Sequence, residues 1–114
     1  MIRFKRALRV GGQMQKELSA LLLKEVRDPR LHTVTIMRVK ITDDLRSARV
    51  FFSTSEGQER KEEALAGFKS ASGYLRRQLC QRLDLKYMPA LEFFYDDKFE
   101  EAIAINKVLK TVIE

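Results

Sequence analysis

The chain has 114 residues, of which 45% are hydrophobic and 33% charged, so its length suits one domain over residues 1–114 with a single core. One cysteine, Cys80, and one histidine, His32, exclude a disulfide framework and leave no cysteine or histidine cluster for a metal, so we expect no cofactor. There is no apolar run long enough for a membrane span and no signal-peptide core, so we expect a cytoplasmic protein. The net charge of +6 is typical of proteins that bind polyanions.

The first predicted element is a helix over residues 5–26, because apolar residues from Ala7 to Leu22 recur at helical spacing. Gly11-Gly12 is its weak point, since a glycine inside a helix costs about 1 kcal/mol relative to alanine. The pattern keeps its phase across the two glycines, which favours one continuous helix. A later start after Gly12, and a flexible end over residues 1–5, stay open.

The side of this helix opposite the apolar stripe is basic. Residues 1–40 hold ten Lys and Arg against three Asp and Glu, a net charge of +7. On a helical wheel the candidate phosphate-binding residues share an arc of about 100°; they are Lys5, Arg6, Arg9, Lys16, Lys24 and Arg27. Arg30 is a further candidate, although its position after Asp28-Pro29 equally suits a cap on the preceding helix.

A β-hairpin is predicted next. Asp28-Pro29 ends the helix, and residues 33–42 are rich in β-branched side chains. Their apolar residues change phase, which indicates a bulge near Met37-Arg38. Asp43-Asp44 supplies a turn, and residues 48–53 alternate as a second, antiparallel strand.

Two helices with a tight corner between them are predicted to follow Gly57. The corner is Ala71-Ser72-Gly73, and the leucines after it recur at a spacing of four. Residues 69–90 carry five Lys and Arg against one Asp, a net charge of +4. Arg76, Arg77 and Arg82 lie on the outer side and are candidate RNA contacts. Tyr74 is open to two interpretations, base stacking or packing.

After Pro89, residues 90–95 read as a third strand, and Asp97-x-x-Glu100 resembles a capping box that opens a last helix. The predicted order is therefore α-β-β-α-α-β-α. It predicts an α+β fold with one three-stranded sheet and helices mainly on one face.

Four motifs carry a family resemblance. They are Arg27-Asp28-Pro29-Arg30-Leu31, Val39-x-Ile41-Thr42-x-Asp44-Leu45-x-x-Ala48-x-Val50, Ala71-Ser72-Gly73-x-Leu75-Arg76 and Leu85-x-x-x-Pro89-x-Leu91-x-Phe93-x-x-Asp96. In this order and spacing they resemble the ribosome-binding factor A family over about residues 6–109. The resemblance implies a type II KH-like domain in which an Ala-x-Gly kink replaces the Gly-x-x-Gly loop that clamps nucleotides in other KH domains. No two glycines here have that Gly-x-x-Gly spacing.

The resemblance also implies a function. It implies a monomeric, non-enzymatic cytoplasmic factor that binds free small (30S) ribosomal subunits and supports late maturation and processing of 16S rRNA near its 5′-terminal helix. Such a factor matters most in the cold and leaves before translation. The partners are then the small subunit and 16S rRNA, with no DNA and no membrane. The chain ends at Glu114, so the flexible C-terminal extension of some family members is expected to be absent.

Three other functions stay open from the residues alone. One is a generic type II KH RNA-binding protein, and another is a protein-interaction module whose basic faces meet an acidic partner. The third is a nuclease in which Asp43/Asp44 and Asp96/Asp97 hold Mg²⁺. It is disfavoured because adjacent residues on a strand point to opposite faces, and because turn and cap signals already explain both pairs.

Overall fold

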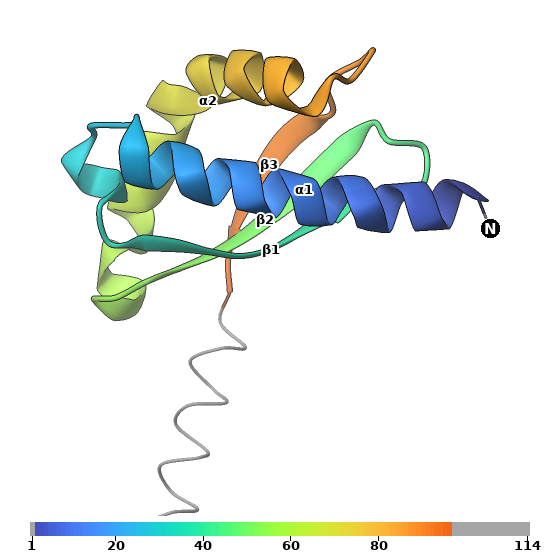
Figure 1. Ribbon diagram of the computed structural model, residues 1–114. Helices are drawn as coiled ribbons and strands as arrows, with labels where there is room; N and C mark the ends of the chain where they lie inside the picture. Colours follow the sequence, from blue (N-terminus) through green and yellow to red (C-terminus); the bar gives the residue numbers. More distant parts are fainter. Residues whose placement is uncertain (1, 97–114) are drawn as a thin grey trace, which may run out of the picture.

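The computed structural model describes residues 2–96, with side chains described from Lys5 onward. Its main elements are two helices and three strands, joined by two 3-10 turns (Figure 1). They run in the order α1 (Ile2–Lys24), η1 (Pro29–Leu31), β1 (Val34–Ile41), β2 (Ser47–Thr54), η2 (Gly57–Arg60), α2 (Lys61–Leu83) and β3 (Ala90–Tyr95). The predicted last helix, from Asp97, lies outside the described residues.

The three strands form one sheet in the order β1-β2-β3. β1 and β2 make the predicted antiparallel hairpin, and β3 lies parallel to β2 because α2 carries the chain back across the sheet. The register shifts between Ile36 and Arg38, which confirms the predicted bulge. In the turn, the Asp44 carboxylate accepts hydrogen bonds from the Thr42 hydroxyl at 2.6 Å and the Arg46 N–H at 3.0 Å.

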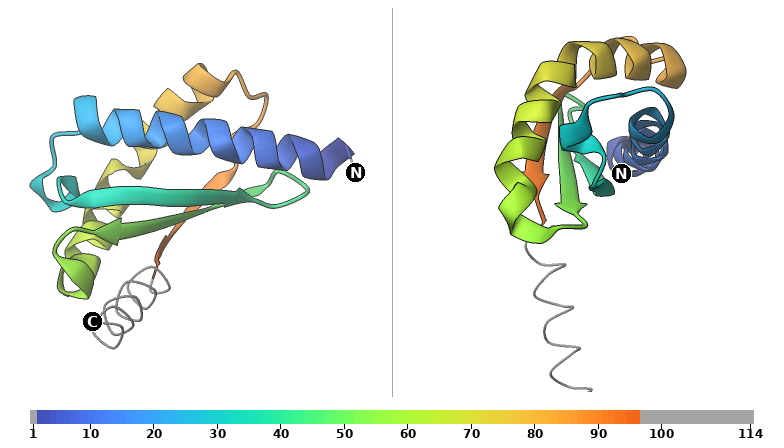
Figure 2. Two further views of the ribbon diagram at one scale, coloured as in Figure 1. Left: turned by 60° about the horizontal axis from the view of Figure 1, so that its bottom comes forward. Right: turned by 90° about the vertical axis from the view of Figure 1, so that its left-hand side faces the viewer.

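Both helices pack on one face of the sheet. Leu18 of α1, Val50 and Phe52 of β2, and Leu75 of α2 are fully buried in a single hydrophobic core. Figure 2 shows α1 running alongside the hairpin while α2 bends over the sheet. The predicted α+β arrangement is therefore confirmed for the described part of the chain.

α1 is one continuous helix across both glycines, and it begins at Ile2, three residues earlier than predicted. Gly11 is buried against β1, where a Cβ atom would lie 2.8 Å from the Val39 carbonyl oxygen. A Cβ at Gly12 would meet nothing within 4 Å. The first glycine thus permits close packing of helix on strand. Since α1 ends at Lys24, Arg27 lies in the connection that follows.

The prediction of two separate helices around a glycine corner was wrong, because α2 is one 23-residue helix. Its axis nevertheless changes direction near its middle (Figures 1 and 2). There the Ser72 hydroxyl donates a hydrogen bond of 3.1 Å to the Lys69 carbonyl, a side-chain bond that bends helices. Gly73 has no positive φ, and a Cβ there would meet only Nη1 of Arg77, at 3.6 Å. The segment 71–73 is therefore a kink inside a helix.

Candidate nucleic-acid interface

All ten basic residues predicted from the sequence to bind RNA are exposed. Two of them, Arg30 and Arg82, form ion pairs within the protein. The other eight pair with no described carboxylate; they are Lys5, Arg6, Arg9, Lys16, Lys24, Arg27, Arg76 and Arg77. We call these eight the unpaired basic residues. Because their charge is not neutralised by a described neighbour, they are available to phosphates.

Arg82 links the two helices. Its guanidinium donates to Glu17 at 3.1 Å and to Glu25 at 2.5 Å, both on the α1 side. Glu25 also accepts a hydrogen bond of 2.7 Å from the Tyr74 hydroxyl. This hydrogen bond, with the charge of Arg82, holds the pKa of the Glu25 carboxyl below its ordinary value. Tyr74 is half-buried, which favours the packing interpretation over base stacking.

Arg30 pairs with Asp28, the residue that caps the N-terminus of η1. Its Nη2 donates to the Asp28 carboxylate at 2.7 Å, and its backbone N–H donates to the same carboxylate at 3.0 Å. These bonds hold the pKa of Asp28 below its ordinary value. Nη2 also donates to Ser70 Oγ at 3.2 Å, so Arg30 ties η1 to α2. Arg30 therefore does not cap the preceding helix α1, which was the alternative raised by the sequence, and three of its five guanidinium N–H donors are already engaged by Asp28 and Ser70.

The kink of α2 places two unpaired arginines beside a hollow. Arg76 and Arg77 line a cavity of about 350 Å³ together with Gly73, Cys80 and Met88. Cys80 is half-buried, and its Sγ lies 3.7 Å from the Leu85 carbonyl oxygen. The hollow thus combines the small residues Gly73 and Cys80 with two guanidinium groups that suit bidentate contacts to phosphate.

A second basic hollow, of about 570 Å³, lies where α1, the β1–β2 turn and the α2–β3 connection meet. Arg6, Arg46, Lys86 and Tyr87 contribute to its lining, and Tyr87 is 77% exposed. Of these four residues, only Arg6 was predicted from the sequence, because Arg46, Lys86 and Tyr87 lie in irregular segments without helical periodicity. The adjacent basic and aromatic residues Lys86 and Tyr87 are the sequence feature that could have indicated this second nucleic-acid contact.

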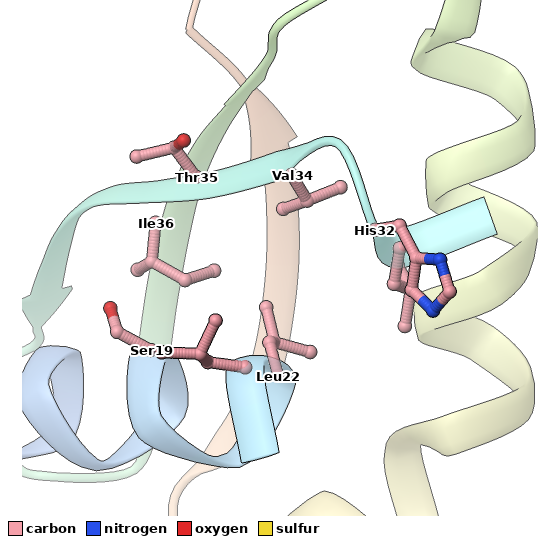
Figure 3. Close-up of a pocket in the computed structure, with 8 residues that line it drawn as sticks. Ser19, Leu22, His32, Val34, Thr35 and Ile36 are labelled. Carbon is pink, nitrogen blue, oxygen red and sulfur yellow. The ribbon is translucent and has the colours of Figure 1, made fainter. Parts of the chain in front are cut away.

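A third cavity, of about 370 Å³, differs in chemistry (Figure 3). It lies between the end of α1 and β1, where Leu22 and Ile36 extend into the space between helix and strand while Thr35 points to the other side of the strand. Its lining contains no Lys or Arg, so it does not suit phosphate. His32 contributes to its lining and is exposed.

Asp43 and Asp44 lie far from Asp96, and Asp97 is outside the described residues. The turn with Asp43 and Asp44 precedes Ser47, which pairs with Ala90 at the start of β3, whereas Asp96 follows Tyr95 at the end of β3. At about 3.3 Å per residue the two places are roughly 20 Å apart along the strand. Among residues 5–96 no group of three His, Cys, Asp or Glu side chains could hold a metal ion, and no described helix is long and apolar enough to cross a membrane.

Comparison with known proteins decides the family. The sequence profile described as ribosome-binding factor A matches residues 6–109 of the chain. The chain belongs to the ribosome-binding factor A family. It is 42% identical over 104 residues to the ribosome-binding factor A of Desulfatibacillum aliphaticivorans, an alignment that covers 91% of this chain and 85% of that relative.

Solved structures of ribosome-binding factor A share the fold. The crystal structure of the Thermus thermophilus factor superposes with a TM-score of 0.69 at 24% identity, covering 78% of this chain and 94% of that one. A homology model of the Thermus thermophilus factor, fitted into a cryo-EM map of a 30S–RbfA complex, gives a TM-score of 0.55 at 27% identity, covering 72% and 90%. The family and relative descriptions name a binding factor and no catalytic activity.

Proposed function

We propose that this protein is a ribosome-assembly factor that binds the small (30S) ribosomal subunit through the unpaired basic residues. The carrying observation is that eight exposed cations, on α1, in the connection after it and on α2, have no described carboxylate partner. Membership of the ribosome-binding factor A family, and a related factor fitted into a 30S complex, support the ribosome as the source of the phosphates.

The mode of recognition follows from the kink. A Gly-x-x-Gly loop would clamp four nucleotides, but here an unbroken, bent helix occupies that place. Lys and Arg contacts to phosphate position a protein without reading sequence. The protein therefore recognises the shape of a folded rRNA junction, with Arg76 and Arg77 at the kink and Lys16 on α1 among the contacts.

The finer role that we propose is late maturation of the small subunit. In it the monomeric, cytoplasmic protein binds free subunits, supports processing of 16S rRNA near its 5′-terminal helix, most of all in the cold, and leaves before translation. It acts by binding and performs no catalysis. Arg82 and Arg30 serve mainly the packing of α2 on α1 and η1.

Sedimentation tests the proposal. Tagged protein in a lysate is expected to co-sediment with free 30S subunits and to be depleted from polysomes. Equal occupancy across polysomes would overturn the assembly role, and association that persists after nuclease treatment would favour a protein partner. Binding to isolated structured RNAs with no preference for 30S subunits would leave a generic type II KH RNA-binding protein.

A further inference from the structure

The sheet face opposite the helices carries a row of stacked side chains. Arg38 of β1, Phe51 of β2 and Phe94 of β3 are neighbours in the strand register. The Arg38 guanidinium carbon lies 4.3 Å from the centroid of the Phe51 ring. The Phe51 and Phe94 rings stack with centroids 5.6 Å apart and an interplanar angle of 28°. A cation and two rings thus form one continuous stack across the three strands.

Among the described residues, the stack ends at Phe94. Phe94 is 41% exposed, and β3 is an edge strand of the described sheet. No described strand therefore lies beyond the outer side of its ring. A large aromatic side chain exposed at the end of a stack offers a surface on which another flat, aromatic group fits.

The next row of the same face is basic. Lys40 and Arg49 are directly opposite each other in the β1–β2 register, and Glu92 is the neighbour of Arg49 on β3. Like charges in directly opposed positions destabilise a sheet. Lys40 and Arg49 form no ion pair with a described carboxylate. A polyanion on this face would relieve that repulsion.

Together the two rows combine an aromatic stack with two cations, Lys40 and Arg49, that form no described ion pair, and one carboxylate, Glu92, leaves the second row net positive. Single-stranded RNA presents that complement, because unpaired bases stack on aromatic and guanidinium planes while the backbone contacts Lys and Arg. A duplex does not present free base faces in this way. The net positive charge of Lys40, Arg49 and Glu92 disfavours a basic partner. The exposed side of the Phe94 ring is best covered by another planar ring, such as an unpaired base.

We propose that this open sheet face binds unpaired RNA bases. A base stacks on the outer side of Phe94 and extends the Arg38–Phe51–Phe94 stack, while Lys40 and Arg49 contact the adjoining phosphates. The proposal rests on the proposed RNA-binding function, but it uses the side of the sheet opposite α1 and α2. The protein then contacts folded rRNA with its helices and an unpaired strand with its sheet.

A base-dependence assay on the full chain tests the stacking. The probes are a fluorescein-labelled octa-adenylate and an abasic octamer with the same phosphates, compared by anisotropy. Wild type is expected to bind the octa-adenylate about 5- to 150-fold more tightly for each stacked base. Phe94→Leu, which keeps apolar bulk without the ring, is expected to abolish the preference, while Phe94→Tyr retains it. Thermal melting of each variant controls for folding.

The outcomes separate the two proposals. Wild type that co-sediments with 30S subunits but binds both octamers equally would overturn the stacking proposal alone, as would an unchanged preference in folded Phe94→Leu. A Lys16→Glu/Arg77→Glu variant that loses 30S binding yet keeps the octa-adenylate preference supports it. If Phe94→Leu instead abolishes binding to an RNA-free ribosomal protein fraction while both octamers bind equally, the face is a protein-docking surface and the RNA proposal is overturned.

Discussion

Gly11 of α1 lies so close to Val39 of β1 that a Cβ on Gly11 would be 2.8 Å from the Val39 carbonyl oxygen. We expect Gly11→Ala to destabilise the protein by about 1–3 kcal/mol, because the added methyl group forces helix and strand apart. The neighbouring variant Gly12→Ala meets open space and is expected to stabilise by up to about 1 kcal/mol. Urea unfolding measures both, and equal stabilisation by the two variants would contradict the close approach.

The kink in α2 predicts a second contrast between glycines. At Gly73 a Cβ meets only the Arg77 side chain at 3.6 Å, whereas at Gly67 it lies 3.0 Å from two carbons of buried Leu31. Gly73→Ala should therefore gain up to about 1 kcal/mol of helix propensity, and Gly67→Ala should gain less or lose stability. Urea unfolding ranks the two. A lower stability for Gly73→Ala than for Gly67→Ala would show that the kink needs its glycine.

The network between the helices predicts an acid dependence. The folded-state pKa of Glu25 is lowered from 4.5, first by the Tyr74 hydrogen bond and further by Arg82. A lowered carboxyl pKa adds stability above the unfolded-state pKa, and that stability is lost as the pH falls through the folded-state pKa. The unfolding free energy should therefore fall below about pH 4.5, and Glu25→Gln should flatten that fall.

Urea unfolding between pH 3 and pH 7 checks this dependence. Glu59→Gln, at an exposed position in η2, is the matched control and should leave the pH profile close to that of wild type. Identical profiles for Glu25→Gln and wild type would mean that the Tyr74–Glu25–Arg82 contacts contribute nothing to folding.

The unpaired basic residues predict a salt dependence. Each neutralised phosphate adds about 0.7–0.9 to the slope of log affinity against log salt, so Lys16→Glu/Arg77→Glu should flatten the slope for 30S binding by roughly 1.5 units. Stability should change by less than about 0.5 kcal/mol per substitution. The measurement is binding to purified 30S subunits across a salt series, with melting as the folding check.

A matched control separates specific contacts from net charge. Arg60 already pairs with Glu56 at 2.5 Å and Glu63 at 2.6 Å, so Arg60→Glu changes the charge without removing an unpaired cation. It should leave the salt slope unchanged. If the Lys16/Arg77 variant also leaves the slope unchanged while remaining folded, these two residues face solvent and the proposed interface lies elsewhere.

The sequence alone predicted the elements whose signal is local. The spacing of apolar residues predicted α1 and the three strands, and the change of phase in the first strand predicted the bulge near Met37. Both patterns depend only on residues a few positions apart in the chain. The exposure of all ten predicted basic residues also followed from helical periodicity and the polarity of the segments. The motifs predicted the ribosome-binding factor A family, which the comparisons confirmed.

Only the tertiary structure decided which of the predicted basic residues form ion pairs with described carboxylates. Arg82 pairs with Glu17 and Glu25, 65 and 57 residues away in the chain, and a helical wheel contains no information about partners at that distance. The sequence also could not explain why Gly11 stands inside a helix, because the reason is the nearby carbonyl oxygen of Val39 on β1, which leaves no room for a Cβ atom. The same limit applies to the Arg38–Phe51–Phe94 stack, because strand register, set when the sheet and its core assemble, brings those three side chains together.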